Sequence, residues 1–205
     1  MSYKSYASAE MYGRIVYAHS QREGAHNTPA AEEKNNLLSH IKGKYGEIAF
    51  LRWLLIRGFF PSHTPFRNDY TIKNQDDDFI VNGVRVEVKS KRRGSRSPFP
   101  PPSHYNVNLG MRTLEKGALY AFIEIGNKGT FEDCREALLL GWATTSRIEA
   151  VGRRVTPQST SDNGNFSFQR YDWDIAIADL FPPDELQQYL TDRRDKYNFE
   201  ARGDH

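Results

Sequence analysis

Residues 78–89 read Asp78-Phe79-Ile80-Val81-Asn82-Gly83-Val84-Arg85-Val86-Glu87-Val88-Lys89, and this pattern predicts a β-hairpin. Asn82-Gly83 is the strongest short hairpin signal, because a two-residue type I′ turn requires positive φ at both central positions. A turn at these residues fixes the register of the two strands. Val81 then lies opposite Val84, and Asp78 lies opposite Glu87.

This register gives the hairpin an apolar face and a charged face. The charged face carries Asp78, Glu87 and Lys89. Directly opposed carboxylates roughly 5 Å apart repel by about 3 kcal/mol at an effective dielectric near 20, and by less in water. Two carboxylates that converge beside a lysine favour a site for a hard divalent cation, which binds oxygen ligands. The alternative is an ordinary solvated face of an amphipathic hairpin.

The composition is that of one globular domain in a reducing compartment. A chain of 205 residues is long enough to bury a sizeable core. The single cysteine, Cys134, excludes a disulfide framework and favours the cytosol. The N-terminus shows no apolar signal core, and the longest apolar stretch, residues 48–56, is too short to span a bilayer. We therefore expect a cytoplasmic protein with no membrane partner.

A basic cluster directly follows the hairpin. The formal net charge of the chain is only +2, so the whole protein does not demand a nucleic-acid partner. The local sequence is different, because no acidic residue interrupts Lys91, Arg92, Arg93 and Arg96. Such a cluster is often a solvated loop, but it can also neutralise phosphate groups.

The rest of the chain predicts helices at both ends and strands between them. We expect helices at 4–23, from Pro29 onward with the main part at 42–57, at 145–151 and at 182–197. We expect strands, besides the hairpin, at 69–73, 105–109, 118–125, 137–144 and 166–171. Residues 92–103 and 152–165 are expected to be loops. This order fits a mixed α/β sheet flanked by helices, with Tyr120 and Trp142 in the core.

Glu47 is the third carboxylate of interest. It lies on the apolar side of the helix that is expected to stop at Gly58, so it needs a partner if it is buried. In the alternative, Glu47 lies at a solvent-exposed helix end and is paired with Lys44 or Arg52. Gly46, like Gly43, costs about 1 kcal/mol in a helix interior. Either another element approaches these glycines closely, or the helix begins here.

Together these residues resemble the PD-(D/E)XK nuclease superfamily, which includes many restriction endonucleases, Holliday-junction resolvases and repair nucleases. The matching pieces are Gly-Lys-Tyr-Gly-Glu at 43–47, Asp78, and Glu87-Val88-Lys89. The family's proline is absent, since Asp77 precedes Asp78. Successive residues of a strand point to opposite faces, so Asp77 would not lie on the charged face and is excluded as a metal ligand. Asp76 would face Lys89 and serve only as a reserve ligand. The resemblance covers about residues 40–150.

The resemblance implies a restriction-endonuclease-like central mixed β-sheet flanked by α-helices. It divides the single domain, 1–205, into a nuclease core at about 40–150, a helical extension at 1–39, and a strand and helix cover at 152–205. Glu124, on the strand at 118–125, is expected to be a polar group at a strand end or a support for the site.

The resemblance also implies metal-dependent hydrolysis of DNA phosphodiester bonds. In this interpretation Asp78, Glu87 and the carbonyl of Val88 hold Mg²⁺, for which Mn²⁺ can substitute. Lys89 orients the attacking water or stabilises developing charge, and Glu47 holds a second metal ion or positions the water. The residues expected to contact the DNA backbone are Lys91, Arg92, Arg93 and Arg96.

Three functions remain open at this point. A restriction-type endonuclease fits best, and the alternatives are a structure-specific nuclease, of the junction-resolvase or repair type, and an inactive DNA-binding module of the same fold. A twofold homodimer suits double-strand cleavage, because each DNA strand needs a site. The sequence contains no phosphate-binding loop of the Gly-Lys-Ser type, so no nucleotide cofactor is expected.

Overall fold

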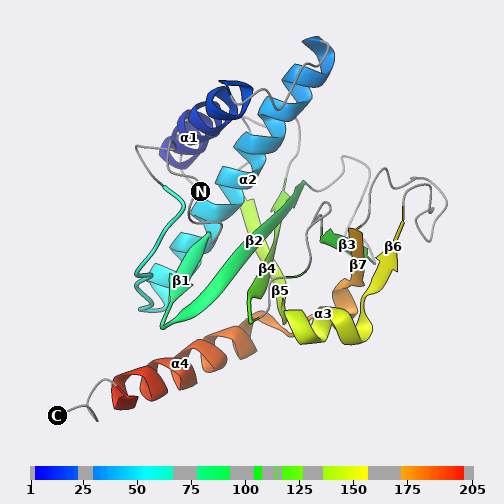
Figure 1. Ribbon diagram of the computed structural model, residues 1–205. Helices are drawn as coiled ribbons and strands as arrows, with labels where there is room; N and C mark the ends of the chain where they lie inside the picture. The colour runs from blue at the N-terminus through cyan, green and yellow to red at the C-terminus, as the bar shows by residue number, and fades with distance from the viewer. Residues whose placement is uncertain are drawn as a thin grey trace.

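The computed structural model of this protein describes residues 3–22, 30–66, 78–92, 104–107, 114, 117–126, 136–156 and 172–200 (Figure 1). The helices of these ranges are α1 (Tyr3–Arg22), α2 (Ala30–Ile56), α3 (Thr145–Val151) and α4 (Pro183–Glu200), with one 3-10 turn at Ile177–Asp179. The strands are β1 (Phe79–Val81), β2 (Val84–Arg92), β3 (His104–Val107), β4 (Leu119–Gly126), β5 (Glu136–Thr144), β6 (Arg153–Val155) and β7 (Asp172–Ala176). No helix among these residues combines the length and the apolar character that a bilayer crossing requires.

The described strands form two sheets. The larger sheet has the order β1-β2-β4-β5 and is mixed, because β2 and β4 run parallel while the other neighbours run antiparallel. The smaller sheet has the order β3-β7-β6 and is antiparallel. The predicted mixed α/β class is confirmed. The second sheet is a correction, because the strand expected near Tyr105 pairs with β7 and not with the central sheet.

The larger sheet is covered on both faces (Figure 1). One face packs against α2 and the start of α4, and this core includes Phe50, Val86, Ile123 and Leu186. The other face packs against α3 and β7, and this core includes Tyr120, Phe122, Ile148 and Ile175. All eight residues of β4 are buried, as expected for a strand with neighbours on both faces. The predicted core positions of Tyr120 and Trp142 are confirmed, at 1% and 4% exposure.

The hairpin forms with the predicted turn and register. Asn82 has φ 50° and Gly83 has φ 75°, as a type I′ turn requires. Phe79 pairs with Val86 and Val81 with Val84. The hairpin turn is also attached to α4, because Asn82 Nδ2 donates a hydrogen bond of 2.9 Å to the carbonyl oxygen of Leu190 on that helix.

Several predicted boundaries need correction. The long helix α2 is continuous from Ala30 to Ile56, so no helix begins near Gly43, and the chain turns at Gly58, where φ is +76°. The expected loop at 152–165 contains strand β6 at its start. The strands expected at 69–73 and 166–171, and the helix start expected at Pro29, lie outside the described residues.

Candidate active site

The candidate site lies where β1 ends and β2 continues. The pairing of Phe79 with Val86 is the last in the register, so β2 extends beyond β1 from Glu87 onward. Asp78 precedes β1 at this point, and its Oδ2 accepts a hydrogen bond of 2.7 Å from the backbone nitrogen of Val88. The carboxylate therefore takes the place of a strand partner and is held at the edge of the sheet.

Glu87 and Lys89 form an ion pair on the next part of β2. The distance between Lys89 Nζ and Glu87 Oε2 is 3.1 Å, and the side chains are 25% and 12% exposed, respectively. Alternate residues of a strand point to the same face, so this pairing follows directly from the Glu-x-Lys spacing. The pair is mostly shielded from water, which strengthens its electrostatic interaction compared with an exposed pair.

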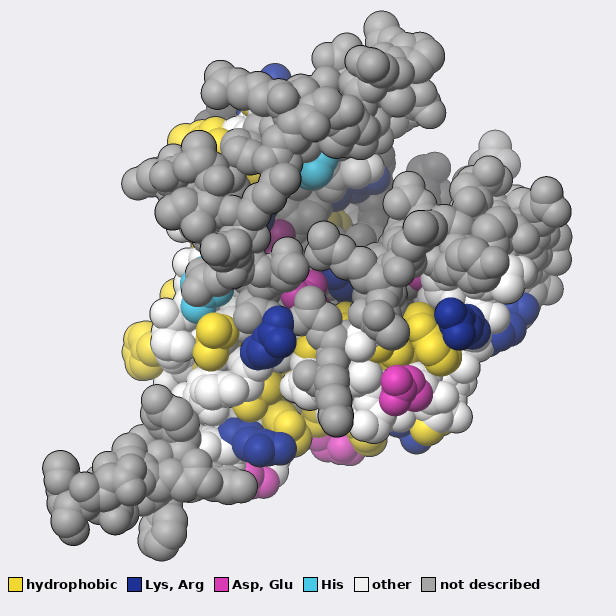
Figure 2. Space-filling model, viewed as in Figure 1, with side chains coloured by type: hydrophobic (Ala, Val, Ile, Leu, Met, Phe, Trp, Pro, Cys, Tyr) yellow, Lys and Arg dark blue, Asp and Glu magenta, His cyan; other side chains and the backbone are white. Residues whose placement is uncertain are grey.

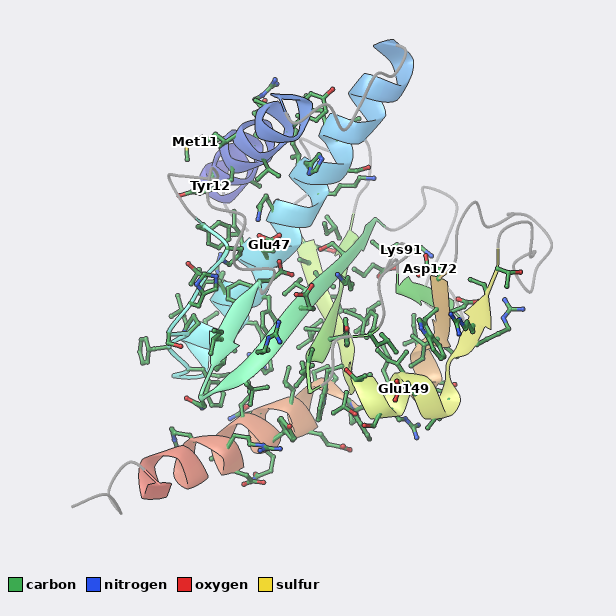
Figure 3. All side chains as sticks on the ribbon, viewed as in Figure 1. Met11, Tyr12, Glu47, Lys91, Glu149 and Asp172 are labelled. Carbon is green, nitrogen blue, oxygen red and sulfur yellow. The ribbon has the colours of Figure 1, made fainter. Side chains whose placement is uncertain are left out.

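Glu47 reaches the same region from α2, where the helix passes beside the strands (Figure 3). Its Oε2 lies 2.6 Å from Lys44 Nζ, and the two side chains are only 9% and 11% exposed. The alternative of a solvated helix end is wrong, because the pair is buried, although one of the two partners named in that alternative, Lys44, is the partner observed. The signal for this pair was the i, i+3 spacing on a helix.

Gly46 allows α2 to approach β2 this closely. A Cβ atom at position 46 would collide with Ser90 Oγ on β2. At Gly43 a Cβ atom would meet nothing within 4 Å. The predicted close approach is therefore confirmed for Gly46 and wrong for Gly43.

Substitution of these two glycines should change stability in opposite directions. We expect Gly46→Ala to lower the free energy of unfolding by about 1–3 kcal/mol, because the added methyl group overpacks the helix against Ser90. We expect the matched control Gly43→Ala to raise it by about 1 kcal/mol, since alanine favours the helix and space is available. Urea denaturation of both variants measures the difference. Equal stabilities would contradict this account of the packing.

The three carboxylates influence one another. Burial and the nearby charge of Glu47 raise the pKa of Asp78 to about 7, although the Val88 hydrogen bond, Lys89 and Lys44 oppose the shift. Burial also raises the pKa of Glu47, against the effect of Lys44, and the charge of Glu87 adds to this rise. Burial would lower the pKa of Lys89, but Glu87 and Asp78 outweigh it and raise that pKa. Near the middle of the space-filling view, acidic and basic side chains are visible close together (Figure 2).

The donor chemistry of this cluster suits a divalent metal ion, although two of its acids, Glu47 and Glu87, are paired with lysines. Among the residues that the structure describes, no group of three or more Asp, Glu, His or Cys side chains is arranged to hold a metal ion. Mg²⁺ does not need such a group, because it commonly binds one or two carboxylates and completes its shell with water and substrate phosphate. Asp78, Glu87 and the Val88 carbonyl provide this kind of donor set. Asp76 lies outside the described residues.

Lys91 lies in a second charged cluster, at the end of β2 nearest the smaller sheet (Figure 3). It is the register partner of Glu124 on β4. Burial lowers the pKa of Lys91, while Asp174 and Glu124 oppose that shift. We expected Lys91 to contact DNA phosphates, and the structure places it beside buried acids. Arg92 ends β2, and its side chain, like all of Arg93 and Arg96, lies outside the described part of the chain.

Asp174 was not identified from the sequence, and Glu124 was expected to be a polar group at a strand end or a support for the site. Glu124 is buried at 2% exposure and is not a strand-end surface group. Asp174 is 4% exposed and lies 2.9 Å from Arg153 of β6. The alternating Asp172-Trp173-Asp174 was an available strand signal, but two acids argued against burial.

Comparisons of the chain with protein-family models, with curated proteins and with solved structures give no match.

Proposed function

We propose that this protein is a metal-dependent DNA endonuclease that hydrolyses phosphodiester bonds and has a restriction-endonuclease-like fold. The observation that carries the proposal is the cluster of Glu47, Asp78 and Glu87 with Lys89, in which Glu47 is buried and the other three are part-buried, at the point where β2 extends beyond β1. Burying several carboxylates together is costly unless cations compensate them. Such an expensive arrangement is typical of a functional site.

Each residue of the cluster has a proposed role. Asp78, Glu87 and the carbonyl of Val88 would hold Mg²⁺, and Glu47 would hold a second ion or position the attacking water. An ion held there would supply a water of lowered pKa and would stabilise negative charge on the phosphate. Lys89 is held beside Glu87 at 3.1 Å, so its ammonium group provides a fixed positive charge near the reacting phosphate.

The DNA contacts of the proposed enzyme come from the residues that follow the site along the chain. Arg92, Arg93 and Arg96 would bind backbone phosphates, which position DNA without reading its sequence. Lys91 contributes less to this surface, because Glu124 and Asp174 already compensate its charge. Among the nuclease types we favour a restriction-type enzyme that acts as a homodimer. We expect it to work in the cytoplasm and to need no nucleotide cofactor.

A second candidate is a catalytically inactive DNA-binding module. The observation that favours it is that Lys44 and Lys89 each form an ion pair with a carboxylate of the cluster. Lysines in these positions provide cationic compensation without any metal ion. A structure-specific nuclease of the resolvase or repair type would use the same site and differ only in its substrate.

The decisive experiment is incubation of the protein with supercoiled plasmid and with a four-way junction, in Mg²⁺ and in EDTA. We expect cleavage of the plasmid into discrete fragments in Mg²⁺ and none in EDTA, because the carboxylates hold the ion that activates water. Cleavage of the junction alone would identify a structure-specific nuclease. DNA binding without cleavage in Mg²⁺ or Mn²⁺ would contradict the endonuclease proposal and support the inactive module.

A further inference from the structure

Lys44 is a buried cation that the proposed reaction does not use. Its side chain is 11% exposed, and its Nζ lies 2.6 Å from Glu47 Oε2. A lysine buried to this degree requires a strong compensating partner, because its ammonium group has lost most of its water. Glu47 is that partner, and the two form a more deeply buried ion pair than Lys89 and Glu87.

Lys44 lies close to an aromatic ring as well as to an acid. Its Nζ lies 6.0 Å from the centre of the Phe66 ring. The Phe66 ring centre lies 5.2 Å from that of Tyr12 on α1 and 6.5 Å from that of Phe79 on β1. The charge of Lys44 acts on Asp78 as well as on Glu47 and favours the ionised form of both carboxylates.

The charge balance of the cluster is close to neutral without a metal ion. Glu47, Asp78 and Glu87 carry three negative charges when ionised, and Lys44 and Lys89 carry two positive charges. A divalent cation would turn this small negative excess into a positive excess. A phosphodiester brings one negative charge and would restore neutrality. Lys44 thus makes the metal-free site more stable and the metal-bound site without DNA less favourable.

We infer that Lys44 is a built-in counterion that competes with the divalent cation for Glu47 and makes tight metal binding depend on bound DNA phosphate. This inference rests on the proposed function and assigns to Lys44 the control of metal affinity. Two ligands that each favour the binding of the other share one coupling free energy, so Mg²⁺ must also tighten DNA binding by the same factor. Lys44 is a positioning residue in this scheme, because it acts through Glu47.

The experiment measures Mg²⁺ binding by the full chain without DNA, using isothermal titration calorimetry. The variant is Lys44→Met, which keeps the length of the side chain and removes the charge. The matched control is Arg52→Met, because Arg52 is an exposed cation on the same helix. We expect Lys44→Met to bind Mg²⁺ about tenfold more tightly than the native protein, which is a typical size for the coupling between two binding events. We expect the Mg²⁺ affinity of the control to equal that of the native protein.

A second measurement tests the dependence on DNA. A short duplex should tighten Mg²⁺ binding by the native protein about tenfold or more, and by Lys44→Met by much less. Unchanged or weaker Mg²⁺ binding by Lys44→Met, with normal binding by the native protein, would overturn the role of Lys44 and leave the proposed metal site intact. Absence of Mg²⁺ binding by the native protein, with and without DNA, would overturn both.

Loss of folding in the variant is also informative. If Lys44→Met unfolds because its acids lack compensation, Mg²⁺ should restore the fold, since a ligand that binds only the folded state stabilises it. Circular dichroism across a Mg²⁺ titration detects this recovery, and Lys44→Gln repeats it with a side chain that still donates a hydrogen bond to Glu47. If both variants stay unfolded at every Mg²⁺ concentration, the ion cannot replace the ammonium group and the inference is wrong.

Discussion

Lys89→Ala is expected to lower the single-turnover rate of DNA cleavage by about 10²- to 10³-fold, the usual cost of losing one fixed group that stabilises charge in a transition state. The physical reason is the placement of its ammonium group, which lies 3.1 Å from Glu87 and is largely shielded from water. DNA affinity measured in EDTA should change by only a few fold, because one phosphate contact among several is lost. Plasmid nicking under excess protein is the measurement.

The matched control for this prediction is Arg85→Ala. Arg85 lies on the same strand and face as Lys89, but it is exposed and is paired in the register with Ile80, away from the carboxylate cluster. Its removal should leave the cleavage rate within about twofold of the native rate, as expected for a surface substitution. If Lys89→Ala cleaves as fast as this control, Lys89 has no role in the reaction and the proposed site is wrong.

Asp78→Asn is expected to stabilise the protein at neutral pH and to abolish cleavage. The pKa of Asp78 is raised to about 7, mainly by burial and then by the charge of Glu47. A carboxyl group whose pKa is higher in the folded state makes the fold less stable as the pH rises from its unfolded pKa, near 4, to its folded pKa. At about 1.4 kcal/mol per pKa unit, the loss at pH 8 is up to about 4 kcal/mol.

The Asp78→Asn variant should not lose this stability as the pH rises, because its side chain carries no charge. Its amide oxygen can still accept the hydrogen bond from the Val88 backbone nitrogen. Urea denaturation in EDTA should show the variant about 2–4 kcal/mol more stable than the native protein at pH 8 and nearly equal to it below pH 4. A constant difference across this pH range would contradict the assignment of the titration to Asp78. The native protein should recover part of the difference when Mg²⁺ is added.

The sequence predicts the hairpin of the candidate site well, because local chemistry determines it. Asn82-Gly83 fixes the turn, the turn fixes the register, and the register puts Asp78 at the edge of β2 beside Glu87 and Lys89. These hairpin features depend on contacts between residues that are close in the chain. The spacing of Glu47 to Lys44 on the helix indicates their pairing, but the approach of Glu47 to the hairpin is a tertiary contact that only the family resemblance implied.

The second charged cluster could not be predicted from the sequence, because it depends on pairing between strands that are far apart in the chain. No turn connects β2 to β4, so the parallel register that puts Lys91 beside Glu124 has no local signal. The smaller sheet joins β3 to β7 across some 65 residues of chain, and both strands are short. An acidic strand such as β7 is expected at the surface unless its partner Arg153 is already known.

The hydrogen bond between Asn82 and Leu190 has a consequence for synthesis on the ribosome. The two residues are 108 positions apart, so the hairpin that carries the carboxylates stays unfastened at its tip until α4 has been made. A nascent chain that ends before this helix contains every acid and lysine of the cluster but lacks this hydrogen bond. In the proposed nuclease, the hairpin would therefore acquire its contact with α4 only late in synthesis, after the residues of the cluster have been made.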